Sequence, residues 1–89
     1  MSELLAQAHG LEVHQVPDGY IVYQGERERV HYLNKTAAII FEFCDGAHGP
    51  DDIVARVATA FELGPSAYTE LRAGLDSLAK EGLILSTSR

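Results

Sequence analysis

Three short strand patterns joined by tight turns precede three helical patterns in this chain of 89 residues. Leu11–Val16 alternates apolar and polar side chains, Tyr20–Gln24 is rich in aromatic and β-branched residues, and Glu28–Leu33 forms a third strand pattern. The connections Pro17–Gly19 and Gly25–Arg27 are too short for a crossover, which predicts an antiparallel meander. The third strand of such a sheet keeps an exposed edge unless another segment covers it.

The first helical pattern follows the third strand directly. Asn34 is a suitable N-cap, and Ala37, Ile40, Phe41 and Cys44 recur at the spacing of one helix face. Asp45-Gly46 is predicted to end this helix, because glycine accepts the left-handed conformation common after a helix.

Two further helices are predicted. The second begins at Pro50, with two acidic residues in its first turn, and stops at Gly64-Pro65. The third runs from about Ala67 to Glu81, with an apolar stripe on one side, and Gly82 follows as its C-cap. Short strands that lead into three helices predict an α+β fold of the winged helix-turn-helix type, in which a three-stranded antiparallel sheet is followed by three helices.

The domain boundaries follow from the same patterns. We expect a flexible, partly disordered N-terminus over residues 1–10, one domain over residues 11–86, and a tail at residues 87–89. No signal peptide and no apolar run of membrane-spanning length is present, so a cytoplasmic protein without membrane contact is predicted.

The charge balance argues against nucleic acid as a partner. The formal net charge is -6, and phosphate binding depends on clustered Lys and Arg. The third helix, which would enter the major groove in a DNA-binding relative, has three acidic residues against Arg72 and Lys80. A basic or amphipathic peptide is the better electrostatic match.

No catalytic or metal-binding pattern is recognisable. Cys44 is the only cysteine, and its apolar neighbours at helical spacing predict a buried core thiol. His9, His14, His31 and His48 are far apart and form no ligand motif. Neither a nucleophile elbow nor a phosphate-binding loop appears, so we expect no enzyme activity, no metal and no cofactor.

At this point the chain resembles the PqqD-like peptide chaperones, also called RiPP precursor peptide recognition elements (RRE). The resemblance covers roughly residues 13–84. It rests on Tyr32-Leu33-Asn34 with Thr36-Ala37-Ala38 at the start of the first helix, Phe41 and Phe43 before Asp45-Gly46, Asp51-Asp52-Ile53-Val54, and the ending Leu78–Ile84. One departure is Phe41, where the family usually has Trp.

The resemblance implies a non-catalytic protein that binds the leader of a ribosomally made precursor peptide. It implies delivery of that peptide to a modifying enzyme, often a radical SAM protein, or to a leader peptidase or cyclase. In the family the leader adds as a strand to the third β-strand and packs against the third helix. The corresponding edge here consists of Glu28, Arg29, Val30, His31, Tyr32 and Leu33.

The residues beside the core stripe of the third helix would complete that site: Tyr68, Arg72, Leu75, Asp76 and Ala79. Arg72 would pair with a leader carboxylate, and Leu75 would hold an apolar anchor. The sequence leaves open which face of the third strand meets the helices. It also leaves open a second function, a winged-helix interaction module that forms a homodimer through the same strand edge.

Overall fold

The structure, a computed structural model, describes residues 3–88; Met1, Ser2 and Arg89 lie outside the described residues. The elements in chain order are β1 (Glu3–Gln7), β2 (Leu11–Val16), β3 (Gly19–Gln24), the 3-10 turn η1 (Gly25–Arg27), β4 (Arg29–Asn34), α1 (Lys35–Glu42), β5 (Asp45–His48), α2 (Pro50–Ala60), the 3-10 turn η2 (Pro65–Ala67), α3 (Tyr68–Lys80) and β6 (Ile84–Ser88). The expected α+β order, a three-stranded antiparallel sheet followed by three helices, is confirmed.

The predicted meander forms the sheet β2-β3-β4, with every pair antiparallel. Gly19, at the end of the β2–β3 turn, allows β4 to pair closely with β3, because an added Cβ would lie 1.8 Å from the carbonyl oxygen of Leu33. The third strand of this sheet, β4, begins one residue later than predicted. Glu28 ends the 3-10 turn in a left-handed conformation (φ 50°), so the pairing with β3 starts at Arg29.

A second three-stranded sheet, in the order β5-β1-β6, was not expected from the sequence. Its central strand lies in the segment predicted to be flexible, and Thr87 and Ser88 of the predicted tail belong to its last strand. The reason is non-local pairing: Glu3 is opposite Ser88 and Gln7 is opposite Ile84. Because these partners stand at opposite ends of the chain, no local pattern indicates the strand.

The first helix begins as predicted and ends earlier. The side chain of Asn34 accepts a hydrogen bond from the Ala37 amide at 2.9 Å, which confirms the N-cap. The helix stops at Glu42, and Asp45-Gly46 belongs to β5 rather than to the helix end. Pairing of β5 with β1 explains this correction, because an extended segment there continues the second sheet.

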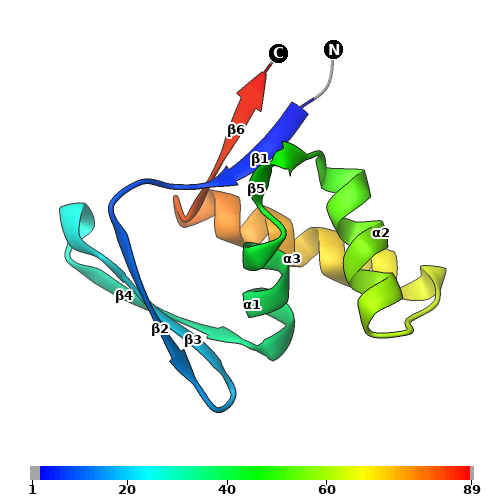
Figure 1. Cartoon of the computed structure of the whole chain (residues 1–89), viewed down its shortest axis with the longest axis horizontal. Helices are drawn as coiled ribbons and strands as arrows, with labels where there is room; N and C mark the ends of the chain where they lie inside the picture. The colour runs from blue at the N-terminus through cyan, green and yellow to red at the C-terminus, as the bar shows by residue number, and fades with distance from the viewer. Residues whose placement is uncertain (1–2, 89) are drawn as a thin grey trace.

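The core lies where the helices meet both sheets, and Figure 1 shows the two sheets on different sides of α1. Phe41 and Ile40 of α1 are almost completely buried, as is Val22 of β3. The predicted stripe of α3 is confirmed: Leu71, Leu75 and Leu78 are all buried. Each such side chain contributes roughly 1.5–3 kcal/mol through burial, so α3 is held firmly against α1 and α2.

Candidate peptide-binding site

The first sheet has two edge strands, β2 and β4, and β4 is the one predicted to receive a peptide. This strand pairs with β3 on one side, and among residues 3–88 no strand pairs with its other side. An edge strand presents unpaired N–H and C=O groups that a further extended chain can pair with. The predicted edge is therefore present, from Arg29 to Asn34.

Alternation along β4 places its side chains on two faces. Leu33 is buried and the His31 side chain is 12% exposed, so these residues face the helices. Val30 and Tyr32 are 64% and 56% exposed and face outward. The structure thus shows that the face of β4 with His31 and Leu33 meets the helices, which the sequence left open.

A polar tether joins this sheet to the end of α3. The buried Gln24 side chain donates to the backbone carbonyls of Glu81 and Gly82 at 3.5 and 3.3 Å. Its Oε1 lies 3.1 Å from His31 Nε2, which therefore acts as the donor, and His31 Nδ1 lies 3.8 Å from Glu81 Oε1. Arg29 Nη2 approaches the same carboxylate at 3.8 Å. These contacts hold the start of β4 beside the C-terminal end of α3.

At the other end of β4 lies a hollow of about 300 Å³. It is formed by the start of α1, the connection before α3, and the first half of α3; its lining residues are Asn34, Thr36, Ala37, Ile40, Leu63, Ala67, Glu70, Leu71 and Gly74. An added Cβ at Gly74 would lie 3.0 Å from Ile40 Cδ1, so close packing of α1 on α3 accounts for this glycine. The hollow has an apolar floor and lies directly beyond the open edge strand.

Four of the five residues predicted on the third helix lie at a hollow that no residue of β4 lines. Arg72, Leu75, Asp76 and Ala79 line a separate hollow of about 90 Å³ beside β1 and β6. Arg72 Nη1 donates to Asp51 Oδ1 of α2 at 2.7 Å. Leu75 is buried in the core, so its side chain is not open to an incoming peptide. Tyr68, at the start of α3, is 42% exposed.

On the other flank of α3, Glu70 and Gly74 share the larger hollow with Asn34, and Glu81 lies beside Arg29 and His31. None of these three was among the predicted site residues. They stand roughly 170° around the helix axis from Arg72 and Ala79, at about 100° per residue. Both flanks border the same buried stripe, and the helical spacing of apolar residues does not indicate which one lies toward the first sheet. The glycine within the helix was the one available hint.

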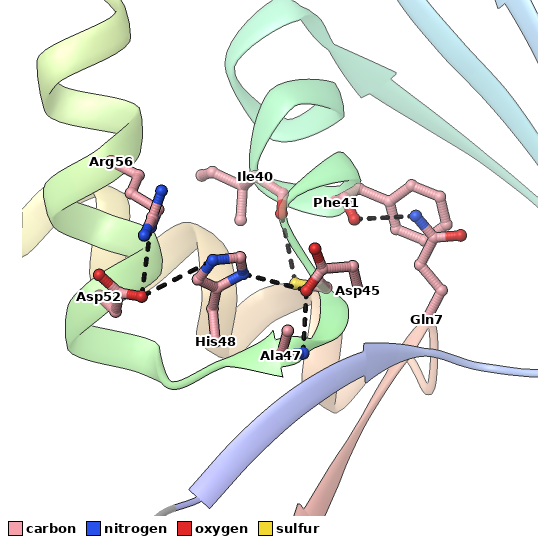
Figure 2. Close-up of polar contacts among 9 residues, drawn as sticks. Gln7, Ile40, Phe41, Asp45, Ala47, His48, Asp52 and Arg56 are labelled. Carbon is pink, nitrogen blue, oxygen red and sulfur yellow. Dashed lines mark hydrogen bonds and ion pairs between the residues drawn. The ribbon is translucent and has the colours of Figure 1, made fainter.

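Cys44 and His48, two side chains of potentially reactive type, both have structural partners. Burial raises the pKa of the Cys44 thiol to about 12, so it stays protonated, and its Sγ lies 3.2 Å from the carbonyl oxygen of Ile40. Figure 2 shows His48 between Asp45 and Asp52, with Nδ1 at 3.0 Å from the first carboxylate and Nε2 at 3.9 Å from the second. Within residues 3–88, no three His, Cys, Asp or Glu side chains are arranged so that they could hold a metal ion. None of the described helices is long and apolar enough to cross a membrane.

A three-stranded sheet with an open edge, beside a helix and an apolar hollow, defines a small binding domain. The family profile described as "Coenzyme PQQ synthesis protein D (PqqD)" matches residues 19–84. This match covers most of the chain, which therefore belongs to the PqqD family, and the resemblance noted in the sequence is confirmed.

Two solved structures share the fold. A structure of TbiB1 in complex with the TbiA(beta) leader peptide has a TM-score of 0.75 at 15% identity, covering 94% of this chain and 99% of that chain. A lasso peptide synthetase B1 complexed with the leader peptide has a TM-score of 0.72 at 24% identity, covering 91% and 96%. At such identities the similarity shows the fold. No curated protein sequence matches this chain.

Proposed function

We propose that this chain is a non-catalytic peptide chaperone that binds the leader of a ribosomally synthesised precursor peptide by strand addition to β4. The observation that carries the proposal is the open edge of β4 beside α3 in a member of the PqqD family. Two proteins of the same fold have been solved with leader peptides bound. Backbone pairing supplies affinity in this mode, and pockets for alternate side chains supply the choice of sequence.

This proposal keeps the strand part of the predicted site and changes its helix part. Arg29 to Leu33 remain the proposed receiving strand, and Glu28 stands just before it in the turn. On α3, we propose that the flank with Glu70, Gly74 and Glu81 replaces the predicted one, because it borders the hollow and the start of β4. A leader that is disordered before binding loses entropy when it becomes a strand, so we expect affinities around micromolar.

The proposed partners are the precursor peptide and one enzyme that acts on it. That enzyme is a modifying enzyme such as a radical SAM protein, or a leader peptidase or cyclase. The net charge of -6 disfavours nucleic acid as a partner. A module that dimerises through β4 is the alternative function, since a second copy would pair with the same edge.

The first test is an amide NMR titration with synthetic leaders of the short precursor peptides encoded near this gene, with a scrambled peptide as control. Hydrogen exchange measured on the same samples supplies an internal control, because β2 is the other edge of the same sheet. We expect shifts and slower exchange in β4 and in α3, with β2 unchanged. Equal protection of β2 and β4, or no response to any leader, would overturn the proposal. A dimer that persists with leader present would support the interaction module.

A further inference from the structure

The proposed site along β4 and α3 has two ends that the structure defines. Glu81 lies beside Arg29 and His31 at the start of the strand, and Glu70 shares the hollow with Asn34 at its end. The strand from Arg29 to Asn34 spans about 17 Å at about 3.3 Å per residue. The helix from Glu70 to Glu81 spans about 17 Å at about 1.5 Å per residue. The two elements therefore match in length, and an extended segment of about six residues fits between these ends.

The two carboxylates at these ends are in different situations. Glu81 already has Arg29 Nη2 and His31 Nδ1 each at 3.8 Å. Glu70 is exposed, and no ion pair or side-chain hydrogen bond involves it within residues 3–88. The nearest arginine along the helix, Arg72, is turned to the other flank and bound to Asp51. The end of the proposed site at the hollow therefore has a negative charge that no basic side chain among residues 3–88 pairs with.

The floor of the hollow, in contrast to the charged Glu70, is apolar. Ala37 and Ile40 of α1 and Leu71 of α3 line it, and Gly74 adds no side chain that would fill it. Leu63, which is 43% exposed, stands at its rim. An aliphatic or aromatic side chain of a peptide that occupies this hollow would replace water with apolar contacts. Glu70 lines the same hollow, so the next residue of the peptide would lie near its carboxylate.

We infer that the hollow at the end of β4 selects leader segments in which an apolar anchor residue is accompanied by a lysine or arginine, and that it rejects an acidic residue at the basic position. The anchor occupies the hollow over Ile40 and Leu71, and the basic side chain pairs with Glu70. This inference rests on the proposed function and specifies the peptide class that the site takes. An exposed ion pair contributes modestly to affinity, so the charge acts mainly by excluding acidic leaders.

The test compares charge reversals in the protein and in the peptide. Glu70→Lys is paired with the control Glu12→Lys, which makes the same change of charge at an exposed position of β2, on the far edge of the sheet. The peptide probes are the synthetic leader found in the titration above and its variants with each Lys or Arg replaced by Glu. Dissociation constants are measured by isothermal titration calorimetry at low and at high salt.

We expect Glu70→Lys to weaken binding of the unaltered leader about fivefold and Glu12→Lys less than about twofold, with the difference reduced at high salt. One Lys→Glu or Arg→Glu peptide should bind the wild type more weakly and regain affinity with the Glu70→Lys protein. Equal effects of the two protein variants, or no peptide restored by the reversal, would overturn the inference while leaving strand addition intact. If no leader binds the wild type, both the inference and the proposed function fail.

Discussion

The tether formed by Gln24 allows a quantitative prediction. Gln24 is 7% exposed and connects three elements: its own strand β3, His31 of β4, and the carbonyls of Glu81 and Gly82 after α3. Gln24→Met keeps the length of the side chain and removes every hydrogen bond. The substitution therefore isolates the polar contribution from packing.

The magnitude follows from the geometry. The two bonds to carbonyls are long, at 3.5 and 3.3 Å, so each is weak, and the contact with His31 at 3.1 Å is closer to ideal. A typical hydrogen bond contributes about 0.5–1.5 kcal/mol net, and a buried group left without a partner costs about 1–3 kcal/mol. Since the burial gained by methionine offsets part of this loss, we expect about 1–2 kcal/mol of destabilisation.

Urea denaturation measures this loss directly, with Gln15→Met as the matched control. Gln15 is exposed on β2 of the same sheet, so the same substitution there should change the free energy of unfolding by less than about 0.5 kcal/mol. In thermal unfolding, the Gln24 variant should melt about 5–15 °C lower, given the size of the domain. If the two variants unfold at the same urea concentration, the tether does not stabilise the protein, and the reasoning about how β4 is held beside α3 is refuted.

Two further predictions concern the second sheet. Leu5 lies in the buried centre of β1, so Leu5→Ala should destabilise the protein by about 2–3 kcal/mol in urea denaturation. The control Leu85→Ala, at a 47% exposed position of β6, should cost less than about 1 kcal/mol. Equal losses of stability in the two variants would contradict the β5-β1-β6 sheet. The hydrogen bond from the Ala47 amide, together with His48, holds the pKa of the Asp45 carboxyl below its usual value. This contribution is present above the unfolded pKa of about 4 and is lost as the pH falls through the lowered folded pKa. Asp45→Asn should therefore reduce the drop in stability between about pH 6 and about pH 3, measured by urea denaturation at both values, and an unchanged drop would contradict the assignment.

The sequence by itself determined the elements whose signals are local. The turn at Gly19 fixed the meander, the side chain of Asn34 fixed the start of α1, and the apolar spacing of Leu71 and Leu78 fixed the buried stripe of α3. Each of these signals operates within a few residues, through backbone conformation, a capping hydrogen bond or helical periodicity. They were sufficient for the fold class, for the edge strand and for the family resemblance.

Only the tertiary structure decided the parts that depend on distant segments. The strand β1 exists because β5 and β6 pair with it, and those partners are far away along the chain. The flank of α3 that meets β4 was fixed by contacts of Glu81 and Gly74 with β4 and α1, while Arg72 was drawn to α2. The buried stripe of α3 has a flank on each side, and the helical periodicity of the sequence does not distinguish these two flanks. Packing of the neighbouring elements alone distinguishes them, and this is why the sequence indicated the edge strand β4 but not which flank of α3 lies near its two ends.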